Sequence, residues 1–286
     1  MVSLMNKIIY TPKGPIELGQ KARFMLTRRM FRELLSSREL IWRLFVRDFS
    51  ARYRQSILGI CWAVIMPLLT SGIFVIMNNS GILQIKGIHC PYPLYAVIGI
   101  SFWSLFSVGL NACAQSIVNA GSMVAKINFP KSSLIIAASA QGIVDLFIRG
   151  GLIAAMFAWY GIFPPVKAVI ICVLLLIPLY LLTVGFGFIL SLIACVVRDT
   201  LVVLNMILMA FLLMTPVLFP VNSATLLADV NRWNPLNYFV NVPRNVLIGG
   251  DASIQEFWWS SLAALLIFYV GWRLFYLAQT KIAERI

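Results

Sequence analysis

The segment RDFSARYRQS (residues 47–56) runs without interruption into ILGICWAVIMPLLTSGIFVIM (residues 57–77), and this junction decides the fold. The first segment is basic and amphipathic, whereas the second holds 21 almost entirely apolar residues without an Asp, Glu, Lys or Arg. A helix of about 20 apolar residues is long enough to cross the hydrocarbon core of a bilayer. The junction therefore predicts a membrane protein whose aqueous surface meets the bilayer near Ser56.

Composition extends this prediction to the whole chain. Of its 286 residues, 60% are hydrophobic and 12% are charged, whereas about 25% of the residues in a soluble domain are charged. The length accommodates about six spans of roughly 20 residues and leaves no room for a large soluble domain. A net charge of +13 would suit a nucleic-acid-binding protein, but 12 of the 23 Lys and Arg residues precede Ile57. That position is typical of a segment held at an anionic membrane surface, so we expect membrane lipids and no nucleic acid as partners.

Hydrophobicity divides the chain into three parts. Residues 1–36 are polar, basic and irregular, and we expect them to form a cytoplasmic N-terminal extension. In residues 37–56, apolar and basic side chains occupy opposite arcs at 100° per residue, which predicts an interfacial amphipathic helix. Residues 57–286 form the predicted transmembrane domain, whose six spans lie near 57–77, 93–118, 134–159, 168–197, 200–220 and 257–278.

The distribution of cations predicts the orientation of these spans. Cytoplasmic loops carry an excess of Lys and Arg. With the N-terminus inside, eighteen cations lie on the cytoplasmic side (the 12 early ones and six later ones) and four lie outside. Six spans then place both termini in the cytoplasm. The fourth span is long and contains Pro178, which predicts a tilt or kink.

The expected fold class is therefore an all-α integral membrane protein with an N-terminal interfacial helix and six transmembrane helices. Residues 221–256 are moderately apolar and punctuated by Pro235, Pro243 and Gly249-Gly250. We expect short re-entrant or gate helices there, before the last span. An ordinary surface loop is the alternative.

Few residues suit enzyme chemistry. The chain has one histidine, ten Asp and Glu residues, and five cysteines that mostly fall inside apolar runs. Neither a phosphate-binding GxxxxGK[ST] segment nor a GxSxG or HExxH motif is present. We expect no catalytic residue, no metal site, inert thiols and no enzyme activity in this chain.

Two pairs of opposite charges stand out among those spaced four residues apart, the spacing that lets side chains on one helix face meet. Asp145 and Arg149 form such an intramembrane pair in the third expected span. Each charge costs roughly 2.5–3.5 kcal/mol at mid-bilayer, so ions there tend to be paired. The pair either lines a pathway or gate, or locks the packing of the bundle. Asp48 and Arg52 repeat the spacing on the interfacial helix, where they either pair while packed against the bundle or mark a bend.

Aromatic side chains in the first two expected spans are candidates for a channel lining, because sugars stack on aromatic faces. For any single one, packing against lipid is the alternative. The candidates are Trp62, Tyr95, Phe102, Trp103 and Phe106.

Residues 47–69, RDFSARYRQSILGICWAVIMPLL, resemble the membrane subunits of type-2 ABC exporters for lipid-linked polysaccharides, which include O-antigen, capsule and teichoic-acid permeases. The shared pattern is a charged RD, then ARY, then S-x-LG-x-x-W and a proline. Further segments match in order: KINFPK (126–131), RD (198–199), TPV (215–217), NPL (234–236) and PRN (243–245). The resemblance covers roughly residues 38–286. Met66, Lys131 and Ser133-Leu134 depart from the family pattern.

The resemblance implies a homodimer in the bacterial cytoplasmic (inner) membrane, paired with two copies of an ABC nucleotide-binding subunit. ATP and Mg are then bound by that partner, and this chain holds no cofactor. The substrate implied is a polysaccharide linked to polyprenyl pyrophosphate. The alternative is a type-2 ABC permease for a small hydrophobic compound such as a drug. A membrane-embedded transferase acting on lipid-linked sugars is a more distant alternative.

The resemblance also assigns expected roles to three groups of residues. The ATPase-coupling segment comprises Lys126, Asn128, Phe129, Pro130 and Lys131. The interfacial helix contributes Arg47, Asp48, Arg52, Tyr53 and Arg54. They are candidates for binding the pyrophosphate head group, and plain anchoring to lipid is the alternative. The outside gate loop contributes Asn234, Pro235, Pro243 and Arg244.

Overall fold

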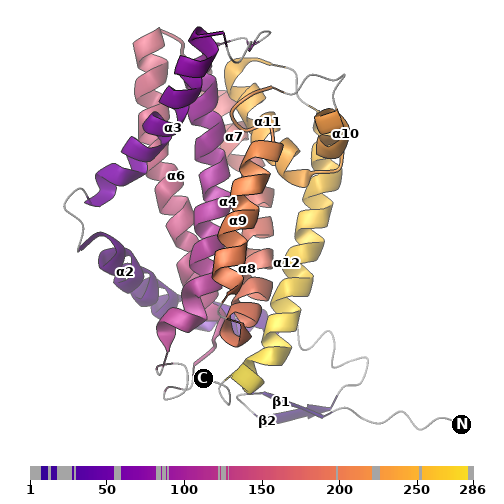
Figure 1. Ribbon diagram of the computed structural model, residues 1–286. Coiled ribbons are helices and arrows are strands. Elements are labelled where there is room, and N and C mark those ends of the chain that lie inside the picture. The colour runs from indigo at the N-terminus through magenta and orange to yellow at the C-terminus, as the bar shows by residue number, and fades with distance from the viewer. Residues whose placement is uncertain are drawn as a thin grey trace, which may run out of the picture.

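The computed structural model describes residues 8–11, 14–17, 28, 30–54, 59–81, 85, 88, 90–121, 123, 127, 129–197, 199–220, 226–250 and 253–282. The long helices of this part run side by side as a bundle (Figure 1). The elements are β1 (Ile8–Thr11), β2 (Gly14–Glu17), α2 (Arg38–Arg54), η1 (Gly59–Cys61), α3 (Trp62–Asn79), α4 (Tyr92–Ala120), α6 (Ser132–Tyr160), α7 (Val166–Leu175), α8 (Ile177–Val196), α9 (Thr200–Met214), α10 (Leu226–Arg232), α11 (Pro235–Ile248) and α12 (Ile254–Ile282).

Within the described residues, five helical segments are long and apolar enough to cross a membrane. They are α3, α4, α6, the continuous stretch α7–α8, and α12. The chain is therefore a multi-pass membrane protein. The fifth expected span, 200–220, corresponds to the shorter apolar helix α9, which ends at Met214. Thr215 is extended, with φ −82° and ψ 139°, because a residue that precedes a proline, here Pro216, disfavours the helical region.

The fourth expected span is broken in the way that Pro178 predicts. Helix α7 ends at Leu175 and α8 begins at Ile177, so that Pro178 lies in the first turn of α8. A proline ring clashes with the carbonyl four residues earlier, and the first turn of a helix is where it is tolerated. Leu176, between the two helices, therefore marks the position where Pro178 predicts a tilt or kink.

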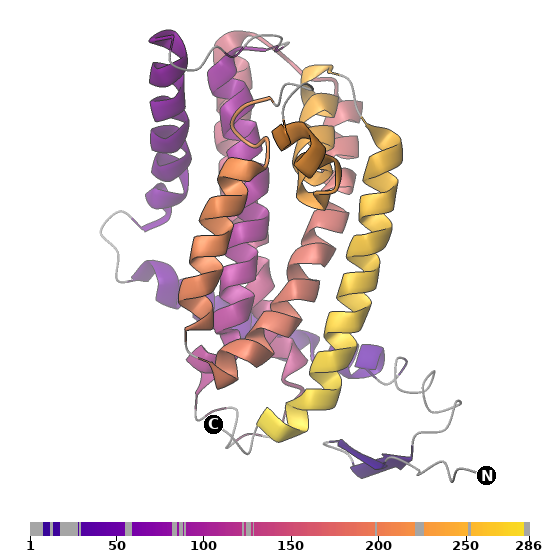
Figure 2. The ribbon, with the colours of Figure 1, turned by 45° about the vertical axis from the view of Figure 1, so that its right-hand side comes forward.

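Helix α4 lies at the centre of the bundle, in contact with α3, α6, α8, α9 and α11 (Figures 1 and 2). Helix α2 lies across the foot of the bundle and packs on α6; we name this the α2 end. The short helices α10 and α11 lie at the opposite end, the α11 end. One hydrophobic cluster fills the middle and the α11 end, and a second, around Phe188 and Phe275, fills the α2 end.

Helix α2 buries a narrower face than its apolar arc suggests. Leu44 is buried and packs in the second cluster, whereas Trp42 is 64% exposed. An amphipathic helix at a membrane surface can turn part of its apolar face toward lipid. The exposed tryptophan fits that arrangement.

A short antiparallel hairpin, β1–β2, pairs Ile9 with Ile16 near the end of α12. The sequence predicts an irregular segment here, so the hairpin was not expected.

Candidate functional site

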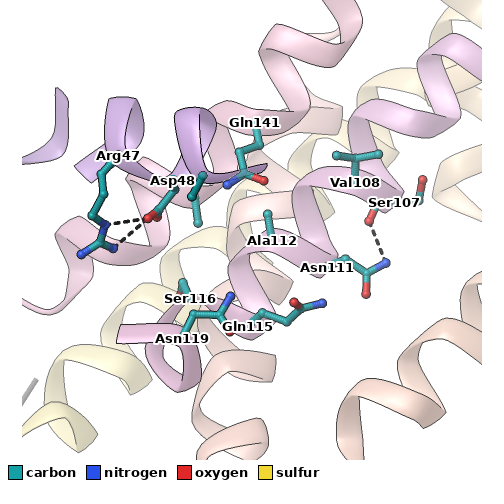
Figure 3. Close-up of a pocket in the computed structure, with 12 residues that line it drawn as sticks. Arg47, Asp48, Ser107, Val108, Asn111, Ala112, Gln115, Ser116, Asn119 and Gln141 are labelled. Carbon is teal, nitrogen blue, oxygen red and sulfur yellow. Dashed lines mark hydrogen bonds and ion pairs between the residues drawn. The ribbon is translucent and has the colours of Figure 1, made fainter. Parts of the chain in front are cut away.

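A polar cavity of about 810 Å³ opens between α2, α4 and α6 at the α2 end of the bundle (Figure 3). Its lining residues are Arg47, Asp48, Ala51, Ser107, Val108, Asn111, Ala112, Gln115, Ser116, Asn119, Ala138 and Gln141. Amide and hydroxyl groups at this depth of a spanning helix cost free energy against hydrocarbon. The cavity is therefore suited to water or a hydrophilic ligand, and we take it as the candidate site.

Helix α4 supplies most of the polar wall. Ser107, Asn111, Gln115 and Asn119 are spaced four residues apart, so they project from the same face of the helix. Asn111 Nδ2 donates a hydrogen bond to the carbonyl of Ser107 at 3.1 Å. Asn111 Oδ1 is buried and has no hydrogen-bond partner among the described residues. One amide oxygen of this wall is thus left without a protein partner.

Helix α2 supplies the charged edge of the cavity (Figure 3). Arg47 pairs with its neighbour Asp48, with Nε and Nη2 both 2.8 Å from Oδ1. Arg47 Nη1 also lies 3.5 Å from the sulfur of Met123. The expected partner of Asp48 was Arg52, whose side chain lies outside the described residues, as do those of Tyr53 and Arg54. Asp48 is thus engaged by Arg47.

Helix α6 carries Gln141 into the cavity and places the intramembrane charges farther along the same helix. Arg149 Nε donates to Asp145 Oδ2 at 2.7 Å, and the two side chains are 9% and 4% exposed. Neither residue lines the polar cavity. The pair is therefore enclosed within the chain and satisfied by its own contact.

The expected coupling segment is described only in part. Lys126 and Asn128 lie outside the described residues, whereas Phe129 and Pro130 are half-buried. Lys131 is 8% exposed, and its Nζ donates to the carbonyl of Gln279 on α12 at 2.9 Å. Burial lowers the pKa of Lys131 below its usual value. Lys131 therefore fastens the segment to α12 instead of standing free on the surface.

The expected gate region folds into α10 and α11. Asn234 caps α11 by accepting a hydrogen bond from the backbone N–H of Leu236 at 3.1 Å, and Pro235 occupies the first helical turn. Asn234 Nδ2 also donates to the hydroxyl of Thr215 at 2.9 Å. Asn231 Nδ2 donates to the carbonyl of Met214 at 2.7 Å. These bonds join the short helices to the end of α9, so this region is not an ordinary surface loop.

Arg244 on α11 is completely buried, with 0% exposure. Its guanidinium donates to the carbonyls of Val217 at 2.6 Å and Pro216 at 3.0 Å, and to Asn241 Oδ1. It also donates to the hydroxyl of Tyr95 at 2.6 Å and lies 3.6 Å from that ring's centroid. Burial lowers its pKa to about 10, so the side chain stays charged at neutral pH. The charge is held by neutral acceptors from three segments.

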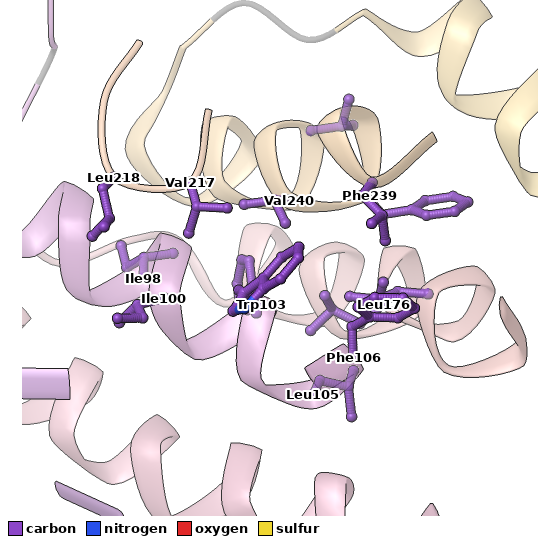
Figure 4. Close-up of a cluster of buried hydrophobic side chains, with 14 of the residues drawn as sticks. Ile98, Ile100, Trp103, Leu105, Phe106, Leu176, Val217, Leu218, Phe239 and Val240 are labelled. Carbon is purple, nitrogen blue, oxygen red and sulfur yellow. The ribbon is translucent and has the colours of Figure 1, made fainter. Parts of the chain in front are cut away.

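The expected channel aromatics have different surroundings. Tyr95, Phe102, Trp103 and Phe106 are buried in the main hydrophobic cluster. Helix α11 covers this part of α4, and Val240 lies opposite Trp103 (Figure 4). Trp62 on α3 is 41% exposed. In this structure four of the five rings therefore pack inside the chain and do not line the polar cavity.

A second cavity, of about 720 Å³, lies between α4, α6, α7 and α8 and is lined almost entirely by apolar side chains. Phe102, Phe157 and Leu176 are among them. Its chemistry matches hydrocarbon and not a hydrophilic chain, which separates it from the candidate site.

Two features of these sites were not predicted from the sequence. The polar residues of α4 recur every four positions within an otherwise apolar run, and a helical projection of residues 93–118 would have found most of them. The contact between Tyr95 and Arg244 joins two residues that are 149 positions apart in the sequence. No local sequence pattern predicts a contact of that kind.

Comparison with known proteins finds one family and several similar proteins that match most of this chain. The profile of the ABC-2 type transporter family matches residues 39–248. An O-antigen export system permease protein RfbA from Myxococcus xanthus is 27% identical over 196 residues, which cover 68% of this chain and 74% of the relative. A protein of the same name from Klebsiella pneumoniae is 21% identical over 244 residues, covering 83% of this chain and 91% of the relative.

Proposed function

Because this chain belongs to the ABC-2 type transporter family, we propose that it is the transmembrane subunit of an ATP-driven exporter of lipid-linked polysaccharide. The substrate is an O-antigen or similar glycan on polyprenyl pyrophosphate, moved from the cytoplasmic to the outer leaflet. The names of the similar proteins from Myxococcus and Klebsiella support this class of substrate.

The polar cavity between α2, α4 and α6 is the observation that carries the proposal. A permease for an apolar compound gains nothing from a wall of amides and hydroxyls within a spanning helix, because those groups are costly to bury without partners. A sugar chain offers hydroxyl groups that donate and accept hydrogen bonds, as amide side chains do. The lining thus suits a hydrophilic polymer.

The membrane arrangement proposed has six spans: α3, α4, α6, α7–α8, α9 and α12. Helix α9 has fifteen residues, so its crossing is completed by the segment that follows it. Both termini and the α2 end face the cytoplasm, and the membrane is the bacterial inner membrane. The excess of Lys and Arg before Ile57 supports this orientation.

Membership of the family implies that the chain pairs with an ATP-binding subunit. The assembly proposed is a homodimer of this chain with two such subunits, which bind ATP and Mg. Residues 126–131 and α2 receive the motion of that partner. Two contacts support this role: Arg47 touches Met123, and Lys131 binds the carbonyl of Gln279. They link the loop between α4 and α6 to α2 on one side and to α12 on the other.

Deletion of the gene in its host tests the proposal. We expect the surface polysaccharide to disappear and the lipid-linked glycan to accumulate on the cytoplasmic side. Rescue must require both this chain and an intact ATP-binding partner. A normal surface polysaccharide in the deletion strain would contradict the proposal.

The apolar cavity lined by Phe102, Phe157 and Leu176 is the observation that favours a second candidate, export of a small hydrophobic compound. Overexpression separates the two functions. A changed susceptibility to hydrophobic drugs with an unchanged surface glycan would favour the second candidate.

A further inference from the structure

The polar residues of α4 form a regular ladder along the candidate site. Successive members, from Ser107 through Asn111 and Gln115 to Asn119, are separated by four residues, or about 6 Å along the helix axis. The ladder therefore extends for about 18 Å from its first to its last member. A ligand that contacts all of it must be elongated.

One polar atom of the ladder has no hydrogen-bond partner among the described residues of the protein. The Oδ1 atom of Asn111 is buried without a hydrogen-bond partner among the described residues, while its Nδ2 is used within the helix. Buried polar atoms in native proteins are nearly always paired, and an exception calls for a partner that the chain does not provide. Asn111 lines the cavity, and a rotation of its side chain toward the cavity would let this oxygen accept a hydrogen bond from a ligand.

The walls of the cavity on α4 and α6 carry no formal charge. Their lining residues are Ser, Asn, Gln, Val and Ala. The charged lining residues described on α2, Arg47 and Asp48, neutralise each other. Uncharged amides and hydroxyls complement groups that both donate and accept hydrogen bonds. A polyanionic chain would instead bring charges beside walls that offer no cation to offset their loss of hydration.

We propose that the α4 ladder is a subsite for uncharged sugar residues and makes this exporter selective for neutral over polyanionic polysaccharide. This inference rests on the proposed function, because it assumes that a glycan passes along the cavity. It adds which glycans are accepted, and it assigns that selectivity to Asn111, Gln115 and their neighbours on α4.

The purified complex with its ATP-binding partner, in lipid nanodiscs, provides the direct test. ATP hydrolysis is measured against increasing polyprenyl-pyrophosphate-linked neutral polysaccharide, and in parallel against the same lipid carrying a uronic-acid polysaccharide. We expect the neutral glycan to stimulate hydrolysis at a half-saturating concentration at least about tenfold lower than that of the acidic one, a difference that a few hydrogen bonds can produce. Equal half-saturating concentrations would overturn the selectivity.

Substitution of the ladder tests the residues. The double variant Asn111→Leu and Gln115→Leu is expected to raise the half-saturating concentration of the neutral glycan at least about tenfold. Its thermal stability should stay level or rise, because it removes an unpaired buried amide oxygen. The matched control is Asn205→Leu on α9, an exposed amide outside the cavity, which should leave both quantities unchanged. An unchanged half-saturating concentration in the folded double variant would overturn the assignment.

Introducing a negative or a positive charge at one position of the ladder separates recognition of a neutral glycan from recognition of an anionic one. We expect both Gln115→Glu and Gln115→Lys to weaken stimulation by the neutral glycan. Two results together would contradict the proposal: stimulation by the neutral glycan that is unchanged in Gln115→Lys, and stimulation of the wild type by the acidic glycan. The subsite would then prefer anionic glycans. A wild-type complex that responds to neither glycan would contradict the proposed function itself.

Discussion

Arg244 carries a guanidinium into the interior of the bundle, where it is bonded to Tyr95 and to the carbonyls of Pro216 and Val217. One acceptor lies on α4 and the two carbonyls lie in the segment after α9, and each would lose this buried donor without the arginine. The side chain therefore fixes α11 against α4 and against the segment after α9. We infer that these parts move together if this end of the bundle opens.

Replacement of Arg244 by Ala should lower the free energy of unfolding by about 3 kcal/mol, because several buried carbonyls lose their donor. Tyr95→Phe keeps the ring beneath the guanidinium and loses one hydrogen bond, so about 1 kcal/mol is expected. Denaturant titration of the purified protein in detergent micelles measures both. The control is Arg232→Ala, since Arg232 is exposed and should change stability by less than about 0.5 kcal/mol. Equal effects of the two arginine variants would contradict the assigned role.

The buried pair of Asp145 and Arg149 predicts different losses of stability when one charge or both charges are removed. Asp145→Asn leaves a buried guanidinium without its counter-ion and should cost about 3–5 kcal/mol. The double variant Asp145→Leu and Arg149→Met removes both charges and should restore most of that loss. The control is Glu39→Gln, which breaks the pair of Glu39 with Arg43. That pair has the same spacing, but both side chains are 75% exposed, so its loss should cost no more than about 0.5 kcal/mol.

Export by the double variant then decides between the two roles considered for this pair. The side chains bind each other and do not line the polar cavity. We therefore expect surface polysaccharide to remain once both charges are gone. Loss of export with a normal amount of protein in the membrane would instead give the pair a part in the pathway.

At the scale of elements, α8 and α12 approach each other closely at two glycines, Gly185 on α8 and Gly271 on α12. A Cβ on Gly185 would lie 2.7 Å from the Cα of Phe268, so a larger residue must push the two helices apart. Gly150 on α6 offers a contrast, because a Cβ there meets nothing within 4 Å.

Gly185→Ala should therefore destabilise the protein by about 1–3 kcal/mol, as overpacking does. Gly150→Ala should be neutral or stabilising by up to about 1 kcal/mol, since alanine favours the helix. The apparent melting temperature of the two variants, purified side by side, checks the prediction. A stable Gly185→Ala variant would mean that α8 and α12 can separate without cost.

At the scale of the whole molecule, the proposed orientation has a direct test. Alkaline phosphatase fused after Pro164, between α6 and α7, should be active because that loop is expected outside. The same enzyme fused after Pro130 should be inactive. A fluorescent protein at the C-terminus should fluoresce, because the terminus is expected in the cytoplasm. The reverse pattern of phosphatase activity would invert the topology.

Much of the fold was predictable because it depends on local properties of the chain. Spans follow from the length of apolar runs, and the break between α7 and α8 follows from Pro178. Helix α9 ended six residues before its predicted limit of residue 220, since hydrophobicity continues past the point where Pro216 stops the helix. The hairpin at Ile8–Glu17 was missed because the prolines and glycine of residues 11–15, TPKGP, were interpreted only as breaking a helix, although such residues also mark turns between strands.

The sequence by itself determined what is local: the apolar spans, the amphipathic α2 and the contact of Asp145 with Arg149, which helical geometry dictates at a spacing of four. Only the tertiary structure decided which polar groups meet across the bundle. It assembled the cavity from α2, α4 and α6, enclosed Trp103 beneath α11, and joined Tyr95 to Arg244. Such contacts depend on how helices pack, and hydrophobic periodicity states which face is buried but not what lies against it.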